Sequence, residues 1–578
     1  MRQRVLASGE VKMTLKTTLL GAVACALLTG PAFAQASTTP AGTPPPPPPA
    51  HKHRHHAEMA TTGSDRLDLL EKRVEEQAEE IHELKAQLNG GATAAPAEVT
   101  ATQFEALQNQ VYEQTAATAT AAKTNAVVQF KPQTPYQHSK AHPTITSPDG
   151  KWTFSPVVLV QGDWASYSQG QPLSASGSPS TKDALKSSGE NFRRAQVGFQ
   201  GTFAGDFGYK FVYDFGGTNG DETYQGFAGA GTAASQYTTS TGAGSGPHIQ
   251  QAWVSYKGFL DPFTFKVGAF ATPANLNDMT SSDDLLFNER PSPSQLSRGL
   301  DGDDGRETVG FIGNGAIWNA SLFMSGDTYG KAALIAPQTT YGGGQEAVVG
   351  RFAVAPWQDP VTNFNLHLGG NFGYVIHPQE STSTAVPGVT TYGITFSDRP
   401  ELRVDNVTFL NTGAINATSA YSAGIEAAAS WGPLMVEGEN FWYGVNRNNP
   451  APGFTNPNFS GWYVEGSWVM TGEPRQYNMA TASFVRPSPD RPFNPGQGDW
   501  GAWELAGRYS STDLDYDLAD PDHIFGGLQK IWSAGVNFYP NDVLKFMFDY
   551  QHVNVENIGA LGVDGQYDTF EIRTQVSF

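Results

Sequence analysis

The last twelve residues constrain the fold of this chain more than any other segment. They read YDTFEIRTQVSF and end at Phe578. Because strand side chains alternate between two faces, one face of this segment is apolar, with Phe570, Ile572, Thr574, Val576 and Phe578. The other face is polar, with Thr569, Glu571, Arg573, Gln575 and Ser577. A transmembrane β-barrel needs this division between lipid and water. An amphipathic strand of a soluble sheet would look the same, so the rest of the chain must decide.

The N-terminal residues predict export from the cytoplasm. Lys12 and Lys16 precede the apolar run LLGAVACALL, and the sequence Ala32-Phe33-Ala34 offers a small-x-small cleavage site. The apolar run is too short for a membrane-spanning helix. Residues 1–34 are therefore predicted to be a cleaved signal peptide, with either Met1 or Met13 as the start.

Cys25 is the only cysteine, and it lies inside this signal, so the mature chain is expected to contain no disulfide. A lipoprotein cysteine is the alternative. It is disfavoured because Ala22 stands where a larger aliphatic residue is usual and because apolar residues continue past Cys25.

Composition excludes some classes of function and fold. The formal charge of −20 argues against nucleic acid as a partner. After the signal, no stretch reaches the roughly 18 apolar residues of a transmembrane helix. The modest hydrophobic content of 39% still permits a barrel, because only alternate residues of each strand face lipid.

Residues 35–63 are predicted to be a linker rich in proline and histidine. The run PPPPPP at 44–49 is typical of an extended polyproline spacer. HKHRHH at 51–56 is interpreted as a solvated, basic part of this linker, with metal binding as the alternative.

Residues 64–125 are predicted to form a periplasmic coiled-coil or helical segment. Heptad positions a and d are occupied by Leu67, Leu70, Val74, Gln77, Ile81, Leu84 and Leu88. A weaker run in phase follows at Phe104, Leu107 and Val111. A single surface helix would leave the narrow apolar seam uncovered, so association is expected, although the pattern does not distinguish two strands from three.

Residues 150–578 show repeated strand and turn signals and are predicted to form the barrel domain. Apolar and polar residues alternate cleanly over 208–215, 364–376, 503–509 and 544–551. Short turns are expected near 205–208, 259–262, 431–433 and 539–542, and long connections near 168–190, 217–246, 271–306, 326–345, 378–416 and 511–527. If both ends of the domain lie in the periplasm, the strand number is even. About sixteen strands are predicted, with 476–484 assigned to a long turn. The fold class is therefore an all-β, transmembrane antiparallel barrel.

Several segments resemble the phosphate-selective porin O and P family. The resemblance rests on the order and spacing of FRRAQVGFQGTFAGDFGYKFVYDF at 192–215, IQQAWVSYKGF at 249–259, LFNERPSPSQL at 286–296, TFSDRPELRVDN at 395–406, GWYVEGSWVMTGE at 461–473 and GAWELAGRYSSTDLD at 501–515. It implies an outer-membrane porin that assembles as a homotrimer of sixteen-stranded barrels. It also implies a loop folded into each pore, which corresponds here to residues 271–306.

Charged residues of this loop and of the barrel wall are the candidate pore-lining set. The loop contributes Arg290, Arg298, Arg306, Asp278, Asp283, Asp284, Glu289, Asp301, Asp303 and Asp304. Alternation assigns to the lumen the basic residues Arg194, Lys210, Lys266, Arg351, Arg508, Lys545 and Arg573. It assigns a larger acidic set of Asp163, Asp214, Glu426, Glu437, Glu439, Glu465, Glu504, Asp549 and Glu571. Because phosphate selection needs basic groups whose charge is not cancelled, a weaker anion preference than the family name implies is predicted. Within the loop, the charges either create a field across the constriction or pair with one another and fasten the loop.

The expected function is a water-filled channel for passive diffusion of small hydrophilic solutes, including phosphate or other anions. A non-selective general or sugar porin and an envelope tether with a structural barrel remain as alternatives. Catalysis is not expected, because the barrel's histidines are scattered and none has a recognisable nucleophile beside it. No cofactor and no metal are expected. The expected partners are outer-membrane lipid, other copies of the chain, and solute.

Overall fold

The computed structural model describes residues 127–131, 142–169, 188–216, 248–328, 344–382, 390–404, 408–558 and 563–578. The predicted signal peptide, linker and coiled coil lie outside these ranges. Within the described ranges, no helix has the length and apolar character needed to cross a bilayer.

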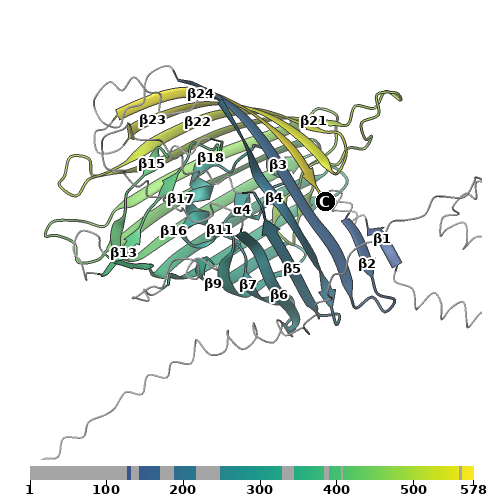
Figure 1. Cartoon of the computed structure of the whole chain (residues 1–578), viewed down its shortest axis with the longest axis horizontal. Helices are drawn as coiled ribbons and strands as arrows, with labels where there is room; N and C mark the ends of the chain where they lie inside the picture. The colour runs from purple at the N-terminus through teal and green to yellow at the C-terminus, as the bar shows by residue number, and fades with distance from the viewer. Residues whose placement is uncertain are drawn as a thin grey trace, which may run out of the picture. The chain divides into compact units, whose positions relative to one another are not determined.

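The described strands form a closed antiparallel barrel of sixteen strands (Figure 1). Consecutive barrel strands pair with each other, and β24 pairs with β3 to close the ring. The barrel strands are β3 (Thr153–Gln169), β4 (Ser188–Phe203), β5 (Phe207–Asp214), β6 (His248–Leu260), β7 (Phe263–Ala269), β8 (Arg306–Asn314), β9 (Trp318–Thr328), β10 (Glu346–Asp359), β11 (Phe364–His377), β16 (Ile415–Trp431), β17 (Leu434–Arg447), β18 (Asn458–Val469), β21 (Ala502–Tyr516), β22 (Ile524–Tyr539), β23 (Leu544–Ile558) and β24 (Val563–Ser577). The predicted class and strand number are confirmed.

Alternation along each strand separates a lipid-facing surface from the interior. On β11, Leu368 and Phe372 are exposed on the outer face, whereas His367 and Asn371 are buried inside. On β24, Phe570 is exposed, whereas Glu571 and Arg573 are fully buried. A shift of one residue in register would place ionised groups in lipid, at a cost of about 2–4 kcal/mol for each Arg or Lys at the bilayer midplane.

The two rims of the barrel differ, as the sequence predicts. Short turns join β4 to β5, β6 to β7, β16 to β17 and β22 to β23, and the start of β3 lies at this same rim, beside the end of β24. The prediction of a long connection at 511–527 is wrong. β21 continues to Tyr516 and β22 begins at Ile524, so the connection is only 517–523. The strands extend past the apolar belt into water. Polar residues there still pair through backbone hydrogen bonds, so a polar stretch does not mark the end of a strand.

One long segment, residues 470–501, belongs to the rim that otherwise has short turns. It contains β19 (Tyr477–Asn478) and β20 (Ser483–Phe484), which pair with each other and not with the barrel. The assignment of 476–484 to a long turn is therefore confirmed.

Smaller strands extend the barrel at both rims. β1 (Val127–Lys131) pairs with β2 (His142–Thr146), and β2 pairs with the start of β3 (Figure 1). Between β11 and β16 lie β12 (Glu380–Thr382), β13 (Thr390–Ile394), β14 (Ser397–Asp398) and β15 (Leu410–Asn411).

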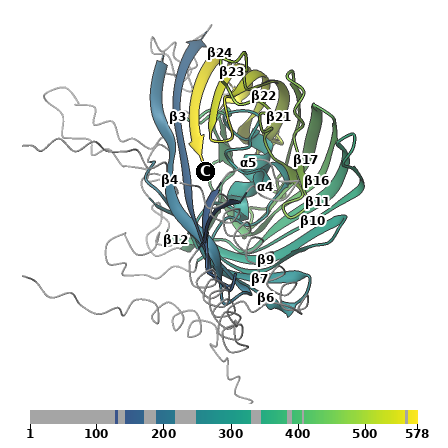
Figure 2. The same cartoon turned by 90° about the vertical axis from the view of Figure 1, so that its right-hand side faces the viewer.

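Two short helices, α4 (Leu276–Met279) and α5 (Ser292–Asp301), lie inside the ring of strands (Figure 2). Both belong to the connection between β7 and β8. Its apolar side chains pack with residues of the wall and of the 470–501 segment: Leu296 and Leu300 join one buried cluster, and Leu276, Leu286 and Phe287 join another. The connection therefore fills part of the interior.

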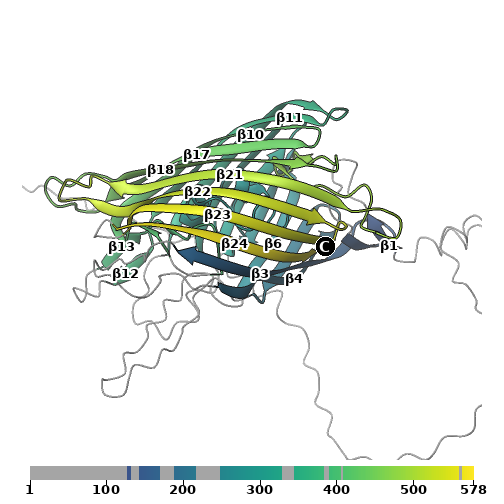
Figure 3. The ribbon, with the colours of Figure 1, turned by 90° about the horizontal axis from the view of Figure 1, so that it is seen from above.

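The inserted connections fill only one side of the barrel interior. Interior residues of β17, β18, β21 and β22, which lie side by side in Figure 3, are buried beneath the folded connections. On β4, β5 and β7, by contrast, most residues of both faces are partly exposed. Since the outer face meets lipid, the open part of the interior must run beside β4–β7.

Candidate functional site

The connection between β7 and β8, residues 270–305, is here called the folded loop. A carboxylate on the opposite wall holds it. Glu439 on β17 accepts hydrogen bonds from the backbone N–H groups of Leu276, at 2.9 Å, and Asn277, at 3.2 Å. These are the first N–H groups of α4, which have no partner within the helix. The wall therefore fixes the loop through a charge-assisted contact.

Arg298 gathers three acidic residues of the same loop. Its guanidinium contacts Asp278 at 2.6 Å and Asp304 at 2.7 Å, and it also donates to Asp303. Asp303 and Asp304 are partly exposed, whereas Arg298 is buried. This group, here called the aspartate cluster, contains three carboxylates for one guanidinium, and its exposed edge is acidic.

The other two arginines of the loop bind backbone carbonyl groups. Arg290 donates to the carbonyl oxygens of Asn277, Asp278 and Thr280, at 3.2, 3.4 and 2.9 Å. Arg306, where the loop enters β8, donates to Gly326 at 3.0 Å and Gly299 at 3.2 Å. Both side chains therefore fasten the loop, which is one of the two interpretations of the loop charges given above.

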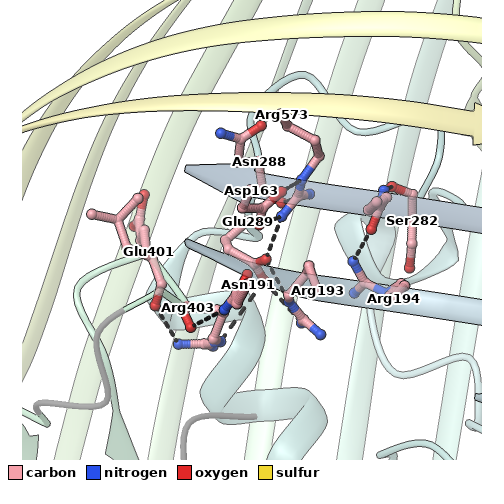
Figure 4. Close-up of polar contacts among 12 residues, drawn as sticks. Asp163, Asn191, Arg193, Arg194, Ser282, Asn288, Glu289, Glu401, Arg403 and Arg573 are labelled. Atoms are coloured by element: carbon pink, nitrogen blue, oxygen red, sulfur yellow. Dashed lines mark hydrogen bonds and ion pairs between the residues drawn. The ribbon is translucent and has the colours of Figure 1, made fainter. Parts of the chain in front are cut away.

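Glu289 of the folded loop connects the loop to three parts of the barrel (Figure 4). Its carboxylate contacts Arg193 on β4 at 2.6 Å, Arg573 on β24 at 3.0 Å and Arg403 at 3.8 Å. Arg573 also donates to both oxygens of Asp163 on β3, at 2.7 and 2.6 Å. The cationic side chains here are thus matched by buried carboxylates.

The predicted basic residues Arg351 and Arg508 of the barrel wall show the same pattern. Arg351 contacts Glu426 at 2.9 Å. Arg508 contacts Glu465 at 2.7 Å and Glu401, from the β11–β16 connection, at 3.0 Å. All of these side chains are at most 2% exposed. They line the interior by register, but they are covered by the folded connections.

The 470–501 segment folds into the barrel and meets the folded loop. Arg351 donates to the carbonyl oxygens of Thr481 and Ala482, both at 2.8 Å. Ser483 Oγ donates to the carbonyl of Met279 in the folded loop at 3.2 Å. Insertions from opposite rims therefore meet inside the barrel.

The remaining predicted acids of the loop lie close to this junction or beneath α5. Asp283 and Asp284 lie 3.7 and 3.8 Å from the guanidinium of Arg486, a residue of the 470–501 segment. Asp301, at the end of α5, is buried, and one of its carboxylate oxygens has no hydrogen-bond partner in the described part of the chain.

The remaining predicted basic residues make contacts of other kinds. Arg194 donates to Gln161 Oε1 at 2.7 Å, and Lys545 donates to the carbonyl of Leu285 at 2.5 Å. Lys266 Nζ lies 4.2 Å from the ring centre of Trp253 and 3.8 Å from that of Phe270. Lys210 reaches the cavity described next.

A cavity of about 380 Å³ lies between the inner face of β3–β6 and the two insertions. The barrel wall contributes the apolar residues Val157, Val158, Leu159, Val212 and Phe578. It also contributes four amides and one lysine, namely Gln196, Gln200, Gln250, Gln251 and Lys210. The folded loop contributes Asp278, Asp283, Asp284, Arg290, Arg298 and Asp304, and the 470–501 segment contributes Asn478, Thr481 and Ser483. Several of the predicted charged residues therefore share one space, whose charged groups come mainly from the folded loop.

Sequence reasoning missed several interior ion-pair partners. Arg475 contacts Glu504 at 2.6 Å, and Arg486, Arg193 and Arg403 also reach the interior. Alternation could not assign Arg475, Arg486 or Arg403, because they lie outside the barrel strands. Arg193 lies where the β3–β4 register shifts, which breaks the alternation.

A closed barrel with an apolar outer face, a polar interior and an inserted loop defines an outer-membrane channel for small solutes. The profile of the family described as "Phosphate-selective porin O and P" matches residues 175–578, and the chain belongs to this family.

The chain is also similar to individual known proteins. Porin O of Pseudomonas aeruginosa is 24% identical over 411 residues, which cover 69% of this chain and 84% of that protein. Among solved structures, OprB of Pseudomonas putida has a TM-score of 0.41 at 9% identity, with 74% of this chain and 94% of that chain covered. An anion-selective porin from Comamonas acidovorans has a TM-score of 0.40 at 11% identity, with 74% and 100% covered.

Proposed function

We propose that this porin is a passive channel with a charge-balanced interior and only weak preference for anions. The supporting observation is the pairing of its arginines. In the described part of the chain, eight interior arginines lie within ion-pair distance of a carboxylate: Arg193, Arg298, Arg351, Arg403, Arg475, Arg486, Arg508 and Arg573. An anion that loses its hydration shell needs basic groups whose charge is not already compensated. The family name suggests phosphate, but the guanidinium groups of these arginines are already paired with carboxylates.

The reversal potential across a KCl gradient in a planar bilayer tests this proposal. We expect a potential close to zero and little block of the current by millimolar phosphate. Strong anion selectivity with block by phosphate would contradict it. A variant sharpens the test: replacing Asp278, Asp303 and Asp304 by Asn leaves Arg298 without its carboxylates, so selectivity should move toward anions. The matched control is Asp490→Asn, an exposed carboxylate of the 470–501 segment.

We also propose that residues 1–34 are cleaved on export, that the coiled-coil segment lies in the periplasm, and that three copies of the barrel associate. The β1–β2 hairpin supports the second point, because it joins the preceding residues to β3 at the rim with short turns. Cell fractionation, N-terminal sequencing of the mature protein and crosslinking in intact outer membranes test these points separately.

A tether with a closed barrel is the second candidate, because insertions from both rims fill much of the interior. In that case the Pro-rich spacer and coiled coil would act on the cell wall, and purified protein would give no conductance steps in KCl. Regular conductance steps would support the channel, while a silent bilayer would favour the tether.

A further inference from the structure

The last two barrel strands place two carboxylates side by side on the inner face. Glu571 on β24 pairs with Asp549 on β23, and both side chains are completely buried. Directly opposed residues of an antiparallel ladder have Cβ atoms about 4.5–5.5 Å apart, so the two carboxylates are close neighbours. Two buried like charges need compensation by hydrogen-bond donors or by positive charge.

The protein supplies little of this compensation. Asp549 Oδ2 accepts a hydrogen bond from the backbone N–H group of Asn288 in the folded loop, at 2.8 Å. Asp549 Oδ1 and both carboxylate oxygens of Glu571 have no hydrogen-bond partner among the described residues. Arg573, two positions along β24 on the same face, already contacts two other carboxylates. Three carboxylate oxygens are therefore left without a donor.

Neutral oxygen atoms without donors adjoin the two carboxylates. Gln551 and Thr569 form the next inward-facing pair of the same ladder, two positions along each strand. The side-chain amide of Gln551 donates to the carbonyl of Glu401 at 3.3 Å, so its oxygen is left for another contact. Gln551 Oε1 and Thr569 Oγ1 have no partner in the described part of the chain, although both residues are at most 2% exposed.

The folded loop covers these side chains from inside the barrel. Asn288, which lies beside Arg573 in Figure 4, is completely buried, and its side-chain oxygen also has no partner among the described residues. Five side chains, here called the acceptor niche, thus share the unpaired oxygens: Asn288, Asp549, Gln551, Thr569 and Glu571. Six oxygen atoms of the niche have no donor in the described part of the chain, two on Glu571 and one on each of the others.

We infer that the acceptor niche binds one hard cation, with Ca²⁺ as the best fit. Ca²⁺ takes roughly six to eight oxygen ligands from carboxylates, amide carbonyls and water, and its charge balances the two carboxylates. In the described part of the chain, no group of three or more His, Cys, Asp or Glu is arranged to hold a metal ion, so the neutral oxygens must complete the coordination. Because the niche contains no His or Cys, it disfavours softer metals.

A cation fits the niche better than water alone. Water molecules could donate to the unpaired oxygens, but they would leave two buried negative charges without a positive partner. A bound cation would join β23 and β24 to the folded loop at Asn288, next to the pairing of β24 with β3 that closes the barrel. The inference therefore concerns the stability of the barrel and is independent of which solute the channel passes.

Refolding of the full-length protein in detergent, with EDTA or with millimolar CaCl₂, tests the inference. Equilibrium dialysis measures the bound ion, and tryptophan fluorescence in urea measures stability. We expect about one Ca²⁺ per chain. Unfolding should require more urea with CaCl₂ than with EDTA, because a ligand that binds only the folded state stabilises it. The absence of bound Ca²⁺ would show that water or a proton occupies the niche, and would overturn the inference.

Two variants assign the ion to the niche. Glu571→Gln and Asp549→Asn keep the shape of each side chain and remove its charge, so each should lose the bound Ca²⁺ and the shift in urea concentration. In EDTA, each variant should unfold at the same urea concentration as wild type or at a higher one, since an uncompensated buried charge is removed. Earlier unfolding in EDTA would show that the protein itself compensates these carboxylates, and would contradict the inference.

Asp568→Asn is the matched control, because Asp568 lies on the same strand but its side chain is 47% exposed. This variant should keep both the bound Ca²⁺ and the stability shift. Equal Ca²⁺ content in wild type, the control and the two niche variants would place the ion elsewhere and refute the inference.

Discussion

Arg573 on the last barrel strand donates two hydrogen bonds to Asp163 on the first, at 2.7 and 2.6 Å, across the β24–β3 pairing that closes the barrel. Both side chains are fully buried. Arg573 also contacts Glu289, but the Asp163 carboxylate depends on Arg573 for compensation of its charge. We therefore expect Arg573→Gln to destabilise the folded barrel by about 3–5 kcal/mol, because it leaves Asp163 buried without its main partner. Urea unfolding in detergent, followed by tryptophan fluorescence, measures this.

A double variant separates lost pairing from lost packing. Arg573→Met combined with Asp163→Leu removes both charges and should recover much of the loss. If Arg573→Gln unfolds at the same urea concentration as wild type, the pair does not stabilise the closure of the barrel.

Glu439 holds the start of α4 in the folded loop. We expect Glu439→Ala to loosen the loop, since it removes two charge-assisted hydrogen bonds worth roughly 1.5–3 kcal/mol each. Single-channel recordings should show higher current noise and more substates. Glu437→Ala, on the same strand, is the control, because Glu437 has one long contact to the loop, at 3.4 Å from Asn277 Nδ2. Equal noise in both variants would argue against this role of Glu439.

The inserted part of the 470–501 segment is predicted to narrow the channel. Replacing residues 477–484 by a short Gly-Ser linker removes β19 and β20, and with them the contact between Ser483 and Met279. Single-channel conductance in KCl should rise severalfold, because the length and width of the narrow region set the resistance of a pore. The matched control replaces residues 491–498 of the same segment, which are exposed, and should leave the conductance unchanged.

Two connections at the rim of long loops are joined by a contact that depends on pH. Asp522 accepts hydrogen bonds from the Thr455 N–H group at 2.8 Å and from the Thr455 hydroxyl at 3.0 Å. The backbone N–H contact lowers the pKa of Asp522 below its usual range. Because the folded-state pKa is depressed, the contact is fully present above the ordinary pKa of an aspartate and is lost as the pH falls through the lowered value.

Limited proteolysis of 448–457 and 517–523 checks this expectation. Wild type should resist cleavage at neutral pH and become sensitive only in strong acid, measured with an acid-active protease. Asp522→Ala should be cleaved faster at neutral pH. Asp517→Asn, in the same connection, should behave as wild type, because Asn tolerates the positive φ of this position. If Asp522→Ala is as resistant as wild type at pH 7, the contact does not order these connections.

Strand alternation made most of the barrel predictable. The segments around Phe211, Phe372, Leu505 and Phe548 alternate so strictly that one register alone keeps charges out of lipid. The same rule assigned Arg351, Arg508 and Arg573 to the interior. It could not tell whether water or protein covers an interior side chain, since that depends on where the connections fold.

Ion-pair partners were not predictable because they join residues far apart in the sequence. Glu401 reaches Arg508, and Glu289 reaches Arg573, only because two connections turn into the barrel. Local periodicity in the sequence does not indicate that a connection turns into the barrel. The length and charge of 271–306 indicated that this connection folds into the pore. The sequence has no comparable signal that Arg475 and Arg486 of the 470–501 segment also lie in the interior.

The contact between Ser483 and Met279 ties together two insertions that start at opposite ends of the barrel. The narrow region of the channel is therefore attached to both rims of the barrel, through one insertion from each. A mutation or a bound molecule that displaces the insertion from one side leaves the other in place as a residual obstruction. Opening the pore to its full width should therefore require two independent changes.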